Sequence, residues 1–382
     1  MDVKAIVLAG GSNATEHIAG VPIALLDVLG EPVVQRVLTR VEKLGVTSTA
    51  VVAEHGCPLP GIRTSLRPNV KFVEAVNGDF WRCAEQQFND FAQQGAELIL
   101  LIRIGPYTEL DYEDFVQFHL DRGARVSVAV NAEGESLDRF IISASRRNDA
   151  AFLLRNELKR PRTPCESYLY KGYINPLRNA ADLRHLALDG FARLNTIAPA
   201  GTEIKPGVWV ADGARIHPGA RVLAPAFIGA RAKIRASAVI TRGSVIEHHA
   251  VVDCGTVVEN STVLPFTYIG AGLDVSISVV GFRQISNLRR NATVEVGDAR
   301  LISMTTTSAP LRTIGTAMDL VTFVPRSLAA GFRRSRTVPQ SIPEAVAKPS
   351  AALASVPEDS SGQSTVASFQ TNLMSARRYG NE

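Results

Sequence analysis

An aliphatic residue recurs at every sixth position through the second half of the chain. The series comprises Ile204, Val210, Ile216, Val222, Ile228, Ile234, Ile240, Ile246, Val252, Val258 and Leu264. Four residues after each of the first ten anchors stands a small or β-branched residue, from Val208 through Ala226 to Thr262. This small residue also lies two positions before the next anchor. Because side chains alternate between the two faces of a strand, the small residue and that anchor point to the same side. The pattern predicts short strands with an interior of aliphatic and small side chains.

Three such hexads make one turn of a triangular coil that stacks on the next turn. This pattern resembles the left-handed parallel β-helix of the hexapeptide-repeat family, and we expect that fold over residues 204–300. The spacing shortens to five between Leu264 and Ile269 before the pattern continues at Val275. One residue is therefore expected to be missing there, near the end of the regular helix.

The first half of the chain alternates between two kinds of segment. Strand-like segments are 4–9, 48–53, 70–73, 97–102 and 125–130, and helix-like segments are 32–44, 80–94 and 112–122, with Asp79 expected to cap the second helix. Such alternation predicts an α/β domain with a doubly wound, Rossmann-like parallel sheet over residues 1–180. Residues 180–194 have a helical pattern, and we expect 181–203 to form a helical connector that docks the two domains.

The C-terminal part of the chain has a different composition. Residues 311–332 mix apolar residues with arginine, which is typical of a segment packing on the end of the β-helix or lying on an anionic membrane surface. The packing role is favoured for 301–330. Residues 331–382 are rich in Ser, Ala, Pro and Arg and contain few large apolar side chains, so we expect a disordered tail.

Charge and cysteine usage exclude several classes of protein. Forty-one Lys and Arg against 37 Asp and Glu give a net charge of +4, which offers no electrostatic footprint for nucleic acid. The four cysteines, Cys57, Cys83, Cys165 and Cys254, form no CxxC pair, which argues against a zinc site or a disulfide framework and favours a reducing cytoplasm. Neither a secretory signal nor a transmembrane run is visible in the sequence.

Two segments of the first half carry a family resemblance. The opening KAIVLAGG and the following PIALLDVLGEPVVQRVLTRVEKLG resemble the sugar-1-phosphate nucleotidyltransferases, which include the mannose-1-phosphate guanylyltransferases. LILLIRIG, a helix containing His119 and GARVSVAV follow in the family's order. The resemblance implies a nucleotidyltransferase domain that joins a sugar 1-phosphate to a nucleoside triphosphate with magnesium. It assigns nucleotide binding to Leu8, Ala9, Gly10, Gly11, Asn77 and Gly78, and sugar binding to Gly172 and Tyr173.

Three charged elements of that family are missing from this sequence. Ser12-Asn13-Ala14-Thr15 stands in place of a Gly-Thr-Arg element, and Ile23 follows Pro22 in place of a lysine. The core strand leads into Ile104-Gly105-Pro106, where the family has a Gly-Asp whose carboxylate binds magnesium. Phosphoryl transfer depends on charge neutralisation by cations and magnesium. We therefore assign no catalytic residue and no metal ligand.

The sequence leaves three functions open. The leading hypothesis is a degenerate relative that binds a nucleotide or nucleotide sugar and acts in regulation or scaffolding of polysaccharide precursor metabolism, as a homo-oligomer of even number or with an active paralogue. The first alternative is an active nucleotidyltransferase in which groups such as Lys4, Arg103, Glu109 and Asp111 replace the missing ones. The second is a hexapeptide acyltransferase with His217 as general base, His248 and His249 being other candidates.

Overall fold

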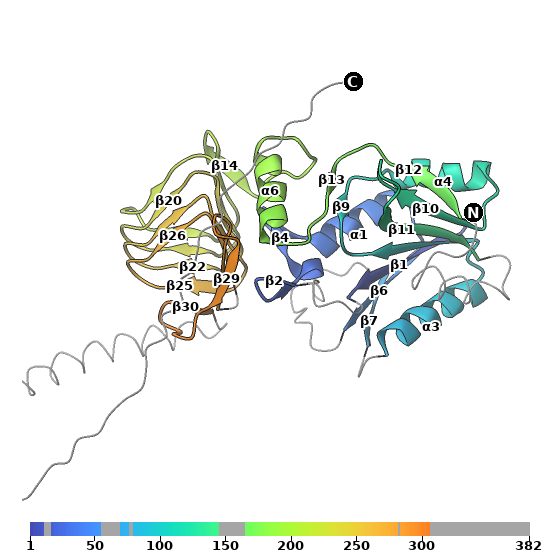
Figure 1. The fold of residues 1–382 in the computed structure, drawn as a ribbon, viewed down its shortest axis with the longest axis horizontal. Coiled ribbons are helices and arrows are strands. Elements are labelled where there is room, and N and C mark those ends of the chain that lie inside the picture. Colours follow the sequence, from blue (N-terminus) through green and yellow to red (C-terminus); the bar gives the residue numbers. More distant parts are fainter. Residues whose placement is uncertain (11–16, 55–68, 76–78, 145–164, 282, 306–382) are drawn as a thin grey trace, which may run out of the picture. The chain divides into compact units, whose positions relative to one another are not determined.

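The strands of the first half pair into one seven-stranded sheet in a computed structural model of the chain (Figure 1). In spatial order they are β12 (Glu166–Leu169), β10 (Val126–Val130), β11 (Ser136–Ser143), β8 (Leu98–Arg103), β1 (Val3–Ala9), β6 (Ser48–Glu54) and β7 (Val70–Ala75). The five strands predicted from the sequence are all present, with bounds that differ by one or two residues. The mixed α/β class is confirmed.

The structure describes residues 1–10, 17–54, 69–75, 79–144, 165–281 and 283–305. Residues 306–382, which include the expected tail, lie outside this part, as do Gly11, Asn77 and Gly78. All the described residues belong to one compact unit. Within it we call residues 1–200 the sheet domain and residues 202–305 the coiled domain.

The sheet is mixed, whereas the sequence predicted a parallel one. β1 pairs in parallel with β6 and β8, but β11 runs antiparallel to both β8 and β10. The reason is a tight connection between β10 and β11, in which the Asn131 side chain accepts hydrogen bonds from the N–H groups of Glu133 and Glu135 at 3.1 and 2.7 Å. So short a connection allows only antiparallel pairing, because parallel strands need a longer crossover.

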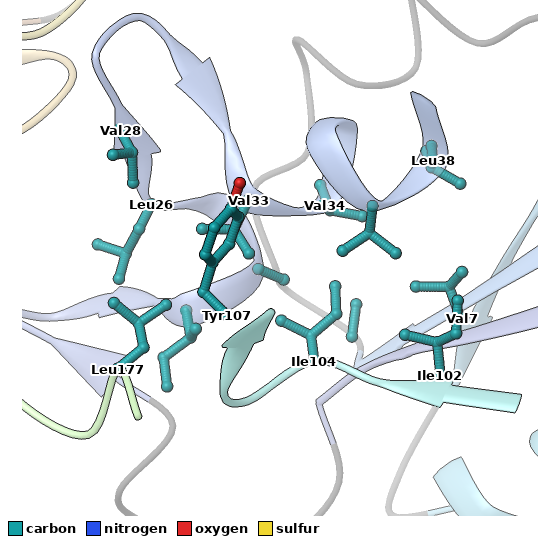
Figure 2. Close-up of a cluster of buried hydrophobic side chains, with 14 of the residues drawn as sticks. Val7, Leu26, Val28, Val33, Val34, Leu38, Ile102, Ile104, Tyr107 and Leu177 are labelled. Carbon is teal, nitrogen blue, oxygen red and sulfur yellow. The ribbon is translucent and has the colours of Figure 1, made fainter. Parts of the chain in front are cut away.

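Helices cover both faces of this sheet. α1 (Val33–Lys43) and α4 (Tyr112–Asp121) contribute to the hydrophobic cluster that contains Val7 and Ile102 of the sheet. α3 (Phe80–Gln93) contributes to the opposite cluster, which contains the alternate strand residues Ile6 and Leu8. Figure 2 shows Val34 and Leu38 of α1 above Ile102 and Val7. Burial on two sides explains the near-continuous apolar runs of the central strands.

The three predicted helices of the first half are confirmed within one residue at each end. Asp111 caps α4 by accepting a hydrogen bond from Glu113 N at 2.9 Å. Asp79 occupies the corresponding position before α3, but its side chain makes no capping hydrogen bond, so that detail of the prediction was wrong. A fourth helix, α6 (Ala180–Phe191), occupies most of the segment predicted as helical over 180–194.

Short elements complete the sheet domain. They are β2 (His17–Ile18) paired with β3 (Val21–Pro22), the 3-10 turn η1 (Ile23–Leu25), β4 (Asp27–Val28) paired with β5 (Glu31–Pro32), and β9 (Tyr107–Thr108) paired with β13 (Ile174–Asn175). The last pair joins the segment after β8 to the segment before α6.

Strands of the coiled domain form three further sheets. The first contains β14 (Thr202–Lys205), β15 (Val208–Val210), β18 (Ala226–Ile228), β21 (Ser244–Ile246), β24 (Thr262–Val263), β27 (Ser278–Gly281), β28 (Gln284–Asn287) and β29 (Ala292–Glu295). The second contains β16 (Arg215–Ile216), β19 (Lys233–Ile234), β22 (Val251–Val252), β25 (Thr267–Ile269) and β30 (Ile302–Met304). The third contains β17 (Arg221–Val222), β20 (Val239–Thr241), β23 (Val257–Glu259) and β26 (Asp274–Ser276). From β15 to β27, consecutive strands visit the three sheets in turn.

The hexad pattern correctly predicts the interior of this domain. Ile228 pairs in parallel with Ile246, eighteen residues or three hexads further on. Ile228, Ile240 and Ile246 are fully buried, and so are the small residues Ala232 and Ala238 that precede anchors. The prediction of an interior position was wrong for the first anchor, Ile204, which is 53% exposed. Its strand, β14, lies at the end of the sheet and runs antiparallel to β15.

The missing residue lies earlier than the sequence suggested. Ile246 pairs with Val263, and Val258 pairs with Val275, so both coils are seventeen residues long. The interior anchor is therefore Val263, and the short spacing falls between Val258 and Val263. Leu264 is also buried, but in the cluster shared with the sheet domain. Because positions 263 and 264 are both aliphatic, the sequence pattern could not show which of them is the interior anchor.

The outer face of the first coiled sheet packs on the sheet domain. Phe227, Val245 and Val279 of this face belong to the same hydrophobic cluster as α1 and α4. α6 adds polar contacts, since Arg184 donates hydrogen bonds to the carbonyl of Gly243 and, at 2.8 Å, to Asn260 Oδ1. α6 is therefore an element through which the two domains are in contact.

A buried carboxylate lies at the same contact. Glu247 follows β21, and its two oxygens accept hydrogen bonds from the N–H groups of Leu29 and Gly30 at 2.9 and 3.0 Å. Beside it, buried Asp27 accepts a hydrogen bond from His248 Nδ1. Burial, followed by the neighbouring Asp27 carboxylate, raises the pKa of Glu247 well above its ordinary value of 4.5.

The interior packing predicts a contrast between two isoleucines. Ile240→Ala removes a fully buried side chain from the coil and should lower the free energy of unfolding by about 3 kcal/mol in urea denaturation. Ile204→Ala, at the exposed first anchor, should change it by less than about 0.5 kcal/mol. Equal effects at the two positions would contradict the assigned interior.

The pKa of Glu247 predicts how stability depends on pH. A carboxyl whose folded pKa is raised contributes stability below its ordinary value of 4.5, and this contribution is lost as pH rises through the folded pKa. Glu247→Gln, which cannot ionise, should therefore flatten the decline in the urea midpoint above about pH 5. The partly exposed Glu259, which pairs with Arg242 at 2.8 Å, supplies the control Glu259→Gln. A decline that persists unchanged in Glu247→Gln would refute the assignment.

Candidate functional site

The expected nucleotide-binding segment lies at the carboxyl end of the central strand. Leu8 and Ala9 are buried residues of β1, and the carbonyl of Leu8 accepts a hydrogen bond from Ile104 N at 2.9 Å. Gly10 follows with φ of +140°, which favours glycine, and a Cβ there would lie 3.2 Å from Glu54 Cγ. Gly10 therefore leaves the backbone at this edge without a side chain, and the place of a Cβ is bordered by Glu54 and Phe80.

This position is a switch point of the sheet. After β1 the chain forms β6 and β7 on one side of that strand. It then crosses over and forms β8, which pairs with β1 on the other side. In open α/β sheets, ligands bind outside the carboxyl ends of the strands at such a point. Leu8, Ala9 and Gly10 thus stand where the topology favours a ligand site.

A buried arginine is hydrogen-bonded to the loop beside this edge. Arg139 of β11 is only 2% exposed, and its guanidinium donates to the carbonyls of Arg103, Pro106, Leu137 and Asp138 at 2.6, 3.0, 3.1 and 3.1 Å. Two of these carbonyls belong to the segment that runs from β8 through Gly105. The guanidinium therefore holds that segment in place and brings a positive charge to it.

An aspartate faces the same segment. Asp138 has a left-handed backbone with φ of +60°, next to an irregularity in the pairing of β10 and β11. Its Oδ2 lies 3.5 Å from the position that a Cβ would occupy on Gly105. Burial raises the pKa of Asp138, and the charges of Arg103 and Arg139 oppose that rise. The irregular strand directs this carboxylate toward the loop.

The surroundings of this loop do not favour a divalent cation. No group of three or more His, Cys, Asp or Glu side chains that could hold a metal ion occurs among the described residues. Asp138 is a single carboxylate beside two arginines, and the buried guanidinium of Arg139 repels a cation. The magnesium that the family resemblance implies therefore does not fit the described residues around this loop.

Three of the four proposed replacement groups have structural roles. Lys4 is buried away from the carboxyl end of β1 and donates to Gln94 Oε1 at 2.8 Å. Glu109 accepts hydrogen bonds from Thr196 N at 2.7 Å and from Arg40 at 3.3 Å. Asp111 caps α4. Arg103, opposite Leu8 in the sheet register, is the one of the four that lies at the edge.

The expected sugar-binding pair lies on the connection to β13. Tyr173 donates to Asp189 of α6 at 2.6 Å, and burial together with this hydrogen bond raises its pKa to about 12. Its ring meets Tyr107 edge-on, with ring centroids 6.3 Å apart. Gly172 is exposed, and a Cβ there would lie 2.2 Å from the Tyr170 hydroxyl. These contacts give Tyr173 a role in holding α6.

A small cavity separates α1 from the loop after β8. Its lining includes Arg36 and Arg40 of α1, Gly105 and Pro106 of the loop, and Arg139. It encloses no more room than one water molecule needs. The sequence analysis assigned no role to these three arginines or to Asp138: Arg139 and Asp138 belong to no motif, and Arg36 and Arg40 lie in a motif segment that was quoted for its apolar spacing.

Each histidine of the coiled domain contacts another residue of the structure. His217 is exposed, and its Nδ1 accepts a hydrogen bond from Gly219 N at 3.0 Å, within the same turn. His248 donates to Asp27 of the sheet domain, and His249 stacks on Phe266 with centroids 4.8 Å apart. The Nδ1 atoms of His217 and His248 are therefore already engaged in hydrogen bonds.

Comparison with known proteins adds no relative. The chain matches no protein-family model and no curated protein sequence. Among the described residues there is also no helix long and apolar enough to cross a membrane. The resemblance to nucleotidyltransferases therefore rests on the motifs of the sequence itself.

The contacts of Arg139 predict a large effect of its removal. Arg139→Met leaves buried carbonyls without a donor and should lower the free energy of unfolding by about 2–3 kcal/mol, measured by urea denaturation. Arg122→Met is the matched control, because Arg122 is an exposed residue that covers the Phe118 ring. It should change stability by less than about 0.5 kcal/mol. A neutral Arg139→Met variant would rule out this role for the guanidinium.

Proposed function

We propose that this chain binds a nucleotide or a nucleotide sugar at the carboxyl edge of β1 without efficient nucleotidyl transfer. The observation that carries the proposal is Gly10, which stands at the switch point of the sheet with a positive φ and no side chain on its backbone. Backbone N–H groups of such glycine-containing turns can approach a phosphate or a base closely.

The sheet domain supports this proposal through its topology and its motifs. In our proposal it is a Rossmann-like domain of the sugar-1-phosphate nucleotidyltransferase type, with Leu8, Ala9, Gly10, Gly11, Asn77 and Gly78 at the nucleotide. Residues 11 and 76–78 lie outside the described part of the chain. Gly172 and Tyr173 were expected at the sugar, but Tyr173 is tied to Asp189, so we leave the sugar contacts unassigned.

The lack of turnover follows from the charges at the same edge. A magnesium-dependent transfer needs carboxylate ligands near the phosphates. Here Ile104-Gly105-Pro106 carries no carboxylate, and the adjacent guanidinium of Arg139 makes the place unfavourable for a cation. Arg103 offers a positive charge to a ligand phosphate instead. Binding without transfer is the function that this combination supports best.

The coiled domain completes the proposed architecture. The three sheets with coils of seventeen or eighteen residues support a left-handed β-helix of the hexapeptide type. A nucleotidyltransferase-like domain joined to such a helix is an architecture of nucleotide-sugar synthases. We propose a regulatory or scaffolding role in polysaccharide precursor metabolism, as a homo-oligomer or together with an active paralogue.

Ligand-dependent stabilisation tests the binding. At a hundred times its dissociation constant, a nucleotide sugar should stabilise the protein by about 2.7 kcal/mol in thermal or chemical denaturation, with or without magnesium. Gly10→Ala should abolish this stabilisation, because the new Cβ crowds Glu54 at the site. Gly45→Ala is the control, since Gly45 also has a positive φ but lies at the end of α1 with nothing within 4 Å of a Cβ.

Pyrophosphate release separates this proposal from its alternatives. We expect no magnesium-dependent turnover across a panel of nucleoside triphosphates and sugar 1-phosphates. Robust turnover would show an active enzyme and overturn the degenerate-site proposal. Acyl transfer from acetyl-coenzyme A that is lost in His217→Ala would instead establish the acyltransferase alternative. An absence of stabilisation by any nucleotide sugar would refute the binding role.

A further inference from the structure

The last strand of the eight-stranded sheet presents an open edge. β28 and β29 form an antiparallel hairpin beyond the final coil, and β29 has no strand on its outer side among the described residues. All four residues of β29 are exposed, and Val294 is 60% exposed. An apolar residue in the middle of an exposed edge strand marks a surface for strand pairing.

The register shows which backbone groups point away from the hairpin. Val296 N donates to Arg283 O at 2.7 Å, so every second residue back from Val296, including Val294, forms its backbone hydrogen bonds with β28. The intervening residues Thr293 and Glu295 therefore direct their N–H and C=O groups outward. These groups are the donors and acceptors that another strand would meet.

The opposite edge of the same sheet is protected, and β29 is not. β14 carries a bulge between Glu203 and Lys205, includes a lysine and is followed by Pro206. Bulges, lysines and prolines are the devices by which edge strands avoid pairing. β29 has regular register and contains neither Lys nor Pro. The two edges are similarly exposed, yet only one is built to resist a partner.

The two ends of β29 are flanked by charges of opposite sign. Arg289 and Arg290 precede the strand, whereas Glu295 ends it and Asp298 follows it, all four being exposed. An antiparallel copy of the same strand brings the basic end of one chain to the acidic end of the other. We propose that the outer edge of β29 pairs with β29 of a second copy of this chain, forming a two-fold symmetric dimer through a continuous sheet.

The outward groups fix the register of this dimer. Thr293 lies opposite Glu295 of the second copy, so that the outward N–H and C=O groups of the two strands bond to each other. Val294 then lies on the two-fold axis beside its own copy, with Cα atoms about 4.5 Å apart as in a non-hydrogen-bonded pair. Arg290 comes opposite Asp298. The same patch serves both copies, as a two-fold interface requires.

Light scattering on the full-length protein across a concentration series tests the interface. The wild type should approach the mass of a dimer, and Val294→Arg should raise the dissociation constant at least about tenfold, because two arginines then meet on the axis. Ile204→Arg is the control, with a similarly exposed residue on the protected edge strand, and should keep the wild-type mass. A monomeric wild type, or a Val294→Arg variant that dimerises like the wild type, would overturn the proposal.

Two further variants test the register. Arg290→Glu and Asp298→Arg should each weaken the dimer, and the double variant should recover it, which a folding defect would not produce. In a Cys254→Ser background, Val294→Cys should form a disulfide-linked dimer on oxidation, whereas Ile204→Cys should not. If residues 306–382 of the same chain cover β29 instead, Val294→Cys gives no linked dimer, and the proposal fails. Neither readout depends on a nucleotide, so the test stands apart from the proposed function.

Discussion

The burial of the Glu247 carboxylate fixes how the coiled domain meets the sheet domain. A buried carboxylate must have hydrogen-bond donors, and here they are the successive N–H groups of Leu29 and Gly30. Both residues have positive φ, +54° and +93°, which turns the two N–H groups toward one point. Gly30 is required there, because a Cβ would lie 2.7 Å from Phe227 Cζ. The β4–β5 turn and the first coiled sheet therefore constrain each other.

The inverse arrangement occurs at the carboxyl edge of the sheet. There the buried charge is the guanidinium of Arg139, and its partners are four backbone carbonyls. A loop held in this way has its shape set by an internal cation, while a magnesium-dependent enzyme would leave room at this place for an external one. At this edge a glycine at the switch point of the sheet lies near a buried positive charge, and that charge disfavours a divalent cation.

The sequence predicts the features that depend on a local pattern of residues. It does not predict the roles of residues whose partners are distant in the sequence. Ile228 and Ile240 were predicted as interior residues because each repeats the pattern of its neighbours. Ile204 obeys the same pattern but is exposed, since a terminal strand has no further coil to pack against. The roles of Glu247 and Arg139 depend on partners up to 218 and 36 residues away. Sequence periodicity does not show such contacts, and so the roles of Glu247 and Arg139 were not predicted, whereas Leu8, Ala9 and Gly10 were named from a motif.

Direct contacts connect the two charged sites. Arg36 of α1 donates to Val28 O at 2.7 Å and pairs with Glu31 at 3.2 Å, which ties the start of the helix to the turn that holds Glu247. One turn further along, Arg40 donates to Tyr107 Oη at 3.0 Å, in the segment after β8. α1 thus connects the β4–β5 turn, which contacts the coiled domain through Glu247, to the loop after β8. The regulatory role that we propose needs such a connection between the proposed ligand site and the coiled domain, whereas nucleotidyl transfer alone does not.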